Sequence, residues 1–136
     1  MRRILATLVV VVALLFSAGS AWADFFYGWA AYERGDYVTA LKEWRPLAEQ
    51  GDAATQHNLG LMYANGEGVP ENDVKAVEWY SKAAKQGFAA AQYNLGNMYG
   101  KGEGVPVNNV RAYMWWSLAK AQGHENAADN LDIVKI

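Results

Sequence analysis

Residues 53–88 read AATQHNLGLMYANGEGVPENDVKAVEWYSKAAKQGF, and residues 89–124 read AAAQYNLGNMYGKGEGVPVNNVRAYMWWSLAKAQGH. Aligned without a gap, the two segments are identical at 21 of 36 positions, and they share the frame AAxQxNLGxMYxxGEGVPxNxVxAxxWxSxAxxQG. A recurrence of this length is typical of stacked supersecondary units, each of which buries its apolar face against its neighbours. The repeat therefore decides the architecture of the chain.

Each 36-residue unit predicts two helices. In the first helix Leu59, Met62 and Tyr63 recur at helical spacing, and the second half of the unit shows the same period. Gly60 and Gly96 fall inside the first helix of their units. Glycine costs about 1 kcal/mol there relative to alanine. Because the cost is repeated, we expect a neighbouring helix to approach closely at both positions.

The glycines between the helices predict turns. Gly87 and Gly123 suit the left-handed residue just past a helix. The segments GEGVP at 66–70 and 102–106 superficially resemble phosphate-binding loops, but no Lys or Ser/Thr follows them and no strand precedes them. We interpret them as turns in which the glycines supply positive φ and the proline starts the second helix.

The frame extends in both directions from the two full units. We expect units at about 24–52, 53–88 and 89–124, followed by a capping helix at 125–136. The first unit has a shorter turn, and Pro46 falls within its second helix, where it should produce a kink. The sequence thus predicts an all-α solenoid of three antiparallel helix pairs plus a C-terminal cap.

The first 23 residues are interpreted as a secretory signal peptide rather than as part of the fold. Arg2 and Arg3 precede an apolar run at 4–16, and small residues follow up to Ala23. An uncleaved membrane anchor is the alternative, but a spanning helix needs about 20 apolar residues. We expect cleavage after Ala23, no stable membrane insertion afterwards, and a periplasmic or secreted protein.

Composition excludes several function classes. The chain has no cysteine, which rules out thiol catalysis and thiolate metal sites. It carries 12 basic and 14 acidic residues, two of the basic ones within the signal peptide, and no basic stripe. A negative chain of this kind is not expected to bind nucleic acid.

The polar residues do not assemble into a predicted active site. His57 and His124 occupy unrelated repeat positions, whereas a metal site needs several converging ligands. Ser81 and Ser117 share one repeat position, which is how a packing residue behaves. We therefore expect no catalytic, metal-binding or cofactor-binding residue, and no enzymatic activity.

The frame LGxMYxxGEGVP resembles the Sel-one-like repeat, a longer-looped relative of the tetratricopeptide repeat, and the resemblance covers residues 24 to about 131. It implies a right-handed superhelix whose first helices line a concave face, and a role in binding proteins. Some cysteine-rich bacterial relatives have been described as penicillin-binding or beta-lactamase proteins. Because this chain lacks their cysteines, that activity is not carried over.

Three asparagines recur at 36-residue spacing, namely Asn58, Asn94 and Asn130. The resemblance implies that an asparagine here holds the backbone of a bound peptide, since an amide both donates and accepts. The alternative is an internal hydrogen bond between adjacent helices, and both interpretations stay open. The neighbours expected on the same face are His57, Leu61, Asn65, Tyr93, Asn97 and Lys101.

Aromatic residues crowd the first predicted helix, which contains Phe25, Phe26, Tyr27, Trp29 and Tyr32. They either pack against the end of the stack or leave an exposed patch for a partner or for self-association. A further expectation places the tryptophans of the later second helices in the core.

Taken together, these features predict an exported module that binds a protein or an extended peptide on its concave face, as an adaptor or regulator in the bacterial envelope. The alternative function is a cell-wall-directed hydrolase or a penicillin-binding-like protein. A third interpretation is a protein that mainly self-associates.

Overall fold

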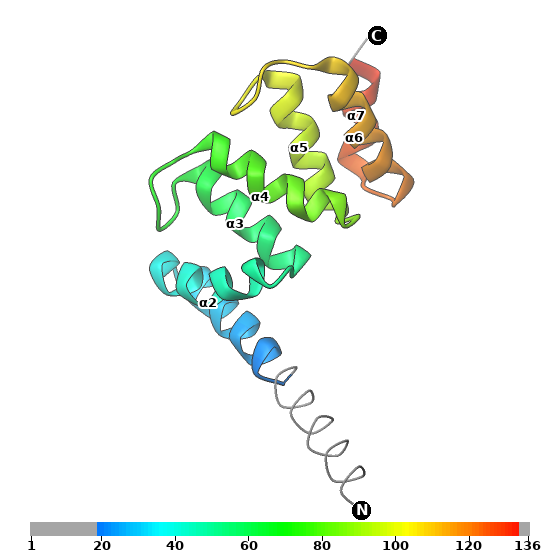
Figure 1. The fold of residues 1–136 in the computed structure, drawn as a ribbon. Helices are drawn as coiled ribbons and strands as arrows, with labels where there is room; N and C mark the ends of the chain where they lie inside the picture. Colours follow the sequence, from blue (N-terminus) through cyan, green and yellow to red (C-terminus); the bar gives the residue numbers. More distant parts are fainter. Residues whose placement is uncertain (1–18, 134–136) are drawn as a thin grey trace, which may run out of the picture.

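A computed structural model describes residues 19–133 of the chain (Figure 1). Residues 19–33 are helical, and the helices that follow are α2 (Tyr37–Glu49), α3 (Ala53–Asn65), α4 (Asp73–Lys85), α5 (Ala89–Lys101), α6 (Asn109–Ala121) and α7 (Glu125–Ile133). The described residues contain no strand. The predicted all-α repeat solenoid is confirmed, while its right-handed sense stays a prediction.

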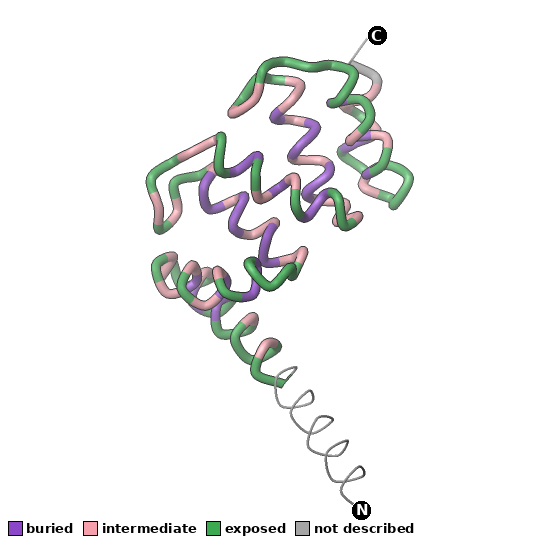
Figure 2. The backbone as a smooth tube through the Cα atoms, in the orientation of Figure 1, coloured by how far each residue is buried: buried purple, intermediate pink, exposed green. Residues whose placement is uncertain are grey.

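Consecutive helices pack against one another along the whole described chain. The ribbon shows them as a stack with helix 19–33 at one end and α7 at the other (Figure 1). The buried residues follow the seams between neighbouring helices (Figure 2). They form three apolar clusters, two at the junctions between successive units and one between the last unit and α7. Ala127 of α7 is fully buried in the last cluster, so α7 covers that end of the stack.

The close approach predicted at the helical glycines is confirmed. A Cβ atom added to Gly60 would lie 2.5 Å from the Tyr80 ring, and one added to Gly96 would lie 2.5 Å from the Trp116 ring. A third contact of this kind joins Gly28 to Trp44 in the first unit. The three rings are 36 residues apart, whereas Gly28 and Gly60 are 32 apart. The first helix is therefore offset by four residues, because the turn after it is short.

The prediction that Pro70 and Pro106 start the second helices is wrong. Helix α4 begins at Asp73, and the side chain of Asn72 caps it by accepting from the Lys75 backbone N–H. Asparagine is a preferred N-cap because its oxygen satisfies an N–H that has no partner within the helix. The prolines lie two residues before their caps, in the turn.

The helix ends show the expected backbone geometry elsewhere. Gly66 ends α3 in the left-handed region with φ +68°, and Gly102 ends α5 with φ +73°. Gly87 and Gly123 also have positive φ just past α4 and α6, as predicted. Pro46 lies inside α2, as expected.

The predicted burial of the tryptophans is only partly right. Trp116 is buried, but Trp79 and Trp115 are half-buried. Trp79 contacts the apolar clusters of both the first and the second junctions, so it bridges neighbouring units. In the first unit the same register position holds Glu43, which has no preceding unit among the described residues to contact.

Most of the predicted signal peptide, residues 1–18, lies outside the described residues. The described helix over residues 19–33 runs through the predicted cleavage position after Ala23. Ala21 packs against the first apolar cluster. Among the described residues, no helix has the length and apolar character needed to span a membrane.

Candidate protein-binding face

The glycine contacts set a common register for the first helices of the three units. With Gly28, Gly60 and Gly96 aligned, the residues of helix 19–33 correspond to those of α3 and α5. We call the resulting surface the ladder face. Its rungs are Trp22–Ala54–Ala90, Phe25–His57–Tyr93, Phe26–Asn58–Asn94, Trp29–Leu61–Asn97 and Glu33–Asn65–Lys101.

In this register the aromatic residues of helix 19–33 occupy the same positions as the amides of the later helices, so the two predicted sites belong to one surface. Phe26 stands where Asn58 and Asn94 stand in the next helices, and Trp29 stands where Leu61 and Asn97 stand. The ladder face is therefore aromatic at its N-terminal end and polar towards its C-terminal end. Because the offset of the first unit is 32 rather than 36 residues, the repeat frame does not reveal this correspondence.

The amides of the ladder face hydrogen-bond to neighbouring helices. Asn94 Nδ2 of α5 lies 3.1 Å from His57 Nε2 of α3. Asn130 Nδ2 of α7 donates to Asn97 Oδ1 at 2.9 Å, and the same oxygen accepts from Trp116 Nε1 at 3.1 Å. These contacts are the internal bonds between helices that formed one of the two interpretations. The binding role of the asparagines stays a prediction.

His57 is held as a neutral ring within this network. Burial lowers its pKa from 6.5 to about 4, although a hydrogen bond with Asn58 acts in the opposite direction. A neutral imidazole can accept the proton of the Asn94 amide at Nε2 while Nδ1 carries the ring proton. The residue therefore positions neighbouring helices at neutral pH.

His57 also takes part in a ring contact that recurs in the next unit. Its ring centroid lies 5.2 Å from that of Phe88, the residue just before α5. One unit later, Tyr93 stacks on His124, just before α7, with centroids 4.5 Å apart. Each pair joins a residue of the second rung to the last residue of the same unit, which immediately precedes the next helix.

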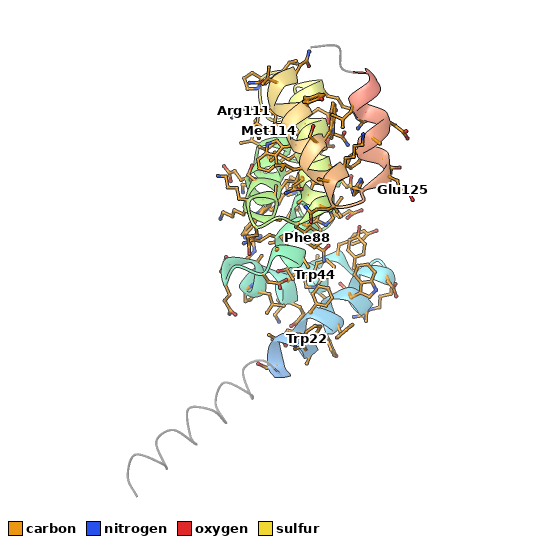
Figure 3. The ribbon with its side chains drawn as sticks, turned by 90° about the vertical axis from the view of Figure 1, so that its right-hand side faces the viewer. Trp22, Trp44, Phe88, Arg111, Met114 and Glu125 are labelled. Carbon is orange, nitrogen blue, oxygen red and sulfur yellow. The ribbon has the colours of Figure 1, made fainter. Side chains whose placement is uncertain are left out.

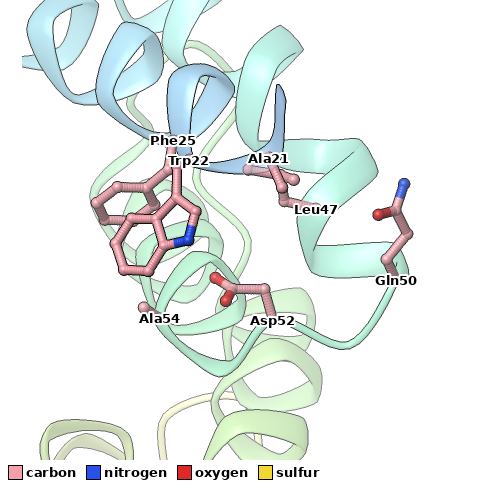
Figure 4. A pocket seen from close by; sticks show the side chains of 7 residues that line it. All are labelled: Ala21, Trp22, Phe25, Leu47, Gln50, Asp52 and Ala54. Carbon is pink, nitrogen blue, oxygen red and sulfur yellow. The ribbon is translucent and has the colours of Figure 1, made fainter. Parts of the chain in front are cut away.

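The first junction lacks this ring contact. Phe25 occupies the position of His57 and Tyr93, but Asp52 occupies the position of Phe88 and His124. A pocket of about 410 Å³ lies here, between helix 19–33, α2 and the start of α3 (Figure 4). It is lined by Ala21, Trp22, Phe25, Leu47, Gln50, Asp52 and Ala54.

The aromatic residues of the first helix divide into two groups. Phe25 and Tyr32 are half-buried and pack against the cluster that contains Trp44. Phe26 and Trp29 are 59% and 43% exposed. Phe25 and Tyr32 thus pack against the end of the stack, whereas Phe26 and Trp29 form an exposed patch. Figure 3 shows Trp22, which is also exposed, at the N-terminal end of the stack.

The remaining predicted residues lie along the same face. Leu61 and Tyr93 are half-buried, whereas Asn65 and Lys101 are exposed at the C-terminal ends of α3 and α5. Asn65 Nδ2 contacts Glu67 Oε1 at 3.5 Å in the following turn. The exposed surface of the ladder face is therefore concentrated at its aromatic end and along the Asn65 edge.

Sequence reasoning missed a second, buried set of amides. Gln56 Nε2 donates to the Ala48 carbonyl oxygen at 3.0 Å, and Gln56 Oε1 accepts from Gln86 at 2.8 Å. The same two bonds recur in the next unit, from Gln92 to Ala84 and from Gln122 to Gln92. The signal was present, since both glutamine positions are identical in the two full units. Each buried glutamine ties together three successive helices.

No metal site appears among residues 19–133: no group of three or more His, Asp or Glu side chains converges there. Ser81 and Ser117 are half-buried on the second helices of their units. Apart from the pocket, the arrangement offers hydrogen-bonding amides and exposed rings, which are the groups that recognise peptides.

Comparison with known proteins agrees with this description. The crystal structure of a Sel1 repeat protein from Oxalobacter formigenes shares 37% sequence identity and a TM-score of 0.76 with this protein, over 79% of this chain and 44% of that chain. A protective antigen of uropathogenic Escherichia coli with an SLR fold shares 39% identity and a TM-score of 0.76, over 85% of this chain and 26% of that one.

An exopolysaccharide production negative regulator of Rhizobium meliloti is 39% identical over 61 residues, which are 45% of this chain and 23% of the regulator. The chain thus spans less than a quarter of that relative. The family model of the Sel1 repeat, a protein-interaction module, matches residues 53–88 and 89–124. These matches cover more than half of the sequence, and the chain belongs to the Sel1 repeat family.

Proposed function

We propose that this protein is an exported adaptor or regulator of the bacterial envelope that binds an extended segment of a partner protein along the ladder face. The observation that carries the proposal is the continuity of this face across units. Exposed rings at one end, Phe26 and Trp29, are followed by the polar edge of Asn65 and Lys101. Aromatic anchors beside polar groups are typical of protein recognition surfaces.

Three further points support the proposal. The N-terminal sequence has the pattern from which we predict a signal peptide, and this pattern favours export. The relative from Rhizobium meliloti is named as a negative regulator, which favours a regulatory role. The fold leaves the exposed rings on a scaffold whose helices are tied by buried amides, so that the face is preorganised for a partner.

Site-specific crosslinking in the native cell tests the choice of face. A photoreactive amino acid at Asn65 should capture a partner protein that mass spectrometry can identify. The matched control places the same group at Glu78, an exposed residue of α4 that is not on the ladder face. We expect adducts from Asn65 only. Equal capture from both positions, or capture from Glu78 alone, would contradict the proposed face.

The exposed rings also favour self-association as a second candidate function. Phe26 and Trp29 form part of an apolar surface at one end of a small protein, and such surfaces often pair with a second copy. Sedimentation velocity over a range of concentrations should then show a dimer that the Trp29→Ala variant lacks. A monomer at all concentrations for both proteins would exclude this function and leave the adaptor proposal intact.

A further inference from the structure

The two junctions between successive units and the junction between the last unit and α7 are built alike, but only two of the three are filled by rings of the chain itself. Phe88 contacts His57 in the second junction, and His124 contacts Tyr93 in the third. In both cases the ring precedes the first helix of the following unit. The same position in the first junction is Asp52.

At this position Asp52 has a carboxylate where Phe88 and His124 have a ring. This difference changes both the capping of the following helix and the space beside it. Asp52 caps α3 by accepting from the Thr55 backbone N–H at 2.9 Å and from Thr55 Oγ1 at 2.8 Å. Phe88 occupies the cap position of α5 without any side-chain hydrogen bond. Because the short carboxylate stays at its own helix, the space that a ring fills elsewhere is the pocket of about 410 Å³.

The walls of this pocket define what fits it. Figure 4 shows the rings of Trp22 and Phe25 beside one another, with the Asp52 carboxylate across from them. Leu47 and Ala54 contribute further apolar surface. An aromatic ring suits such walls, since ring faces and edges pack favourably against other rings. A hydrogen-bond donor on that ring would meet the carboxylate, whereas an acidic group would be repelled by it.

We propose that this pocket binds one aromatic side chain of the partner, a tyrosine or tryptophan whose O–H or N–H donates to Asp52. The inference rests on the proposed function, because it names the anchor of the segment that lies along the ladder face. The pocket adjoins Phe26 through Phe25 and Trp22, so an anchored ring would place the following partner residues over the exposed aromatic rungs.

The position of signal-peptide cleavage affects the shape of the pocket. Cleavage after Ala23 would remove Ala21 and Trp22 from its wall and leave Phe25, Leu47, Gln50, Asp52 and Ala54. The test therefore uses protein purified from the compartment in which it accumulates, with its N-terminus determined by mass spectrometry. The remaining walls still present a ring on one side and the carboxylate on the other.

The probe is N-acetyl-L-tyrosinamide, titrated into isotope-labelled protein and followed by NMR chemical shifts. We expect saturable shifts at Leu47, Asp52 and Ala54, and none with N-acetyl-L-alaninamide or N-acetyl-L-aspartamide at equal concentrations. The Asp52→Phe variant supplies the missing ring and reproduces the cap position of α5. It should keep the helical circular dichroism of the native protein while weakening binding of the probe by about tenfold or more.

A second variant separates the effect of the carboxylate from that of the space. Asp52→Asn keeps an N-cap and the open pocket but removes the charge. It should weaken binding of N-acetyl-L-tyrosinamide more than binding of N-acetyl-L-phenylalaninamide, whose ring carries no donor. Probe shifts that persist unchanged in Asp52→Phe, or native protein that shows no shifts at the pocket, would overturn the inference.

The crosslinking experiment distinguishes failure of this inference from failure of the proposed function. If Asn65 captures the same partner in native protein and in Asp52→Phe with equal yield, the pocket is not the anchor although the ladder face binds. If the probe binds at the pocket but Asn65 captures nothing, the pocket recognises rings and the proposed partner face is wrong. Capture that falls by about tenfold in Asp52→Phe supports both.

Discussion

Replacing Gly96 by alanine tests the packing on which the ladder register depends. Alanine gains about 1 kcal/mol over glycine in helix propensity. Its Cβ would lie 2.5 Å from two atoms of the Trp116 ring, a distance that requires the ring or the helix to move. Trp116 is 6% exposed, and its Nε1 donates to Asn97 Oδ1. The ring therefore has little room to rotate without losing this bond.

Overpacking of a tight core costs about 1–3 kcal/mol. A weakened hydrogen bond at a buried indole adds about 1 kcal/mol. After subtracting the gain in propensity, we expect Gly96→Ala to lower the free energy of unfolding by about 2 kcal/mol. Urea unfolding followed by circular dichroism measures this as a lower midpoint with an unchanged slope.

Gly100→Ala on the same helix is the matched control. Its added Cβ would lie 3.1 Å from Cη2 at the far edge of the Trp116 ring, and α3 carries Ala64 at this register position. We expect the free energy of unfolding of Gly100→Ala to lie within about 1 kcal/mol of that of the native protein. If Gly96→Ala is as stable as native protein, or if Trp116→Leu does not relieve its cost in a double-mutant cycle, the argument from close approach is refuted.

Two other variants address the buried amide and the buried imidazole. Gln56→Ala leaves the Ala48 carbonyl without its donor and should destabilise the protein by about 2 kcal/mol in urea unfolding, whereas exposed Gln50→Ala should change stability by less than about 0.5 kcal/mol. The pKa of His57 falls from 6.5 to about 4 on folding, so the unfolded chain binds the extra proton first as the pH decreases. The contribution of the neutral ring is complete above pH 6.5 and is lost between pH 6.5 and about 4, by about 3 kcal/mol. The His57→Tyr variant introduces the residue type that the next unit has at Tyr93, and it should remove this part of the pH dependence of the free energy of unfolding. If the variant and the native protein show the same pH dependence, this prediction is contradicted.

The sequence predicted the helix pairs and the glycine contacts because both depend on a short and constant period. Leu59, Met62 and Tyr63 lie on one side of a helix whatever surrounds it. Gly60 and Gly96 stand at a fixed interval from the rings that cover them, so a repeated glycine was sufficient to indicate close approach. The local part of the fold follows from residues within one unit.

The rest depends on residues that differ between units. His57 pairs with Phe88, but the next unit pairs Tyr93 with His124, so no single motif describes the contact. The half-burial of Trp79 depends on how a preceding unit lies against it. The correspondence of Phe26 with Asn58 depends on an offset of four residues that only the packing of Gly28 on Trp44 reveals.

The ends of the stack provide a reason to regard the exposed rings as a recognition surface. At the N-terminal end, Glu43 replaces the bridging tryptophans of later units, and Tyr27 replaces Leu59, which is fully buried inside the stack. The carboxylate of Glu43 thus replaces an apolar ring, and the phenol of Tyr27 replaces an aliphatic side chain, at two positions that contact a preceding unit elsewhere in the stack.

Phe26 and Trp29 do not follow that pattern. The counterparts of Phe26 are the half-buried amides Asn58 and Asn94, so at this position the change runs from polar to aromatic towards the N-terminal end. The counterparts of Trp29 are Leu61 and Asn97, so this position is apolar in both of the first two units. Protection of an open end does not explain these aromatic residues. Phe26 and Trp29 add exposed apolar surface at the same end of the stack where Glu43 replaces a tryptophan. A partner that covers these rings does explain them, since exposed aromatic side chains on a rigid face contribute most when another protein removes them from water.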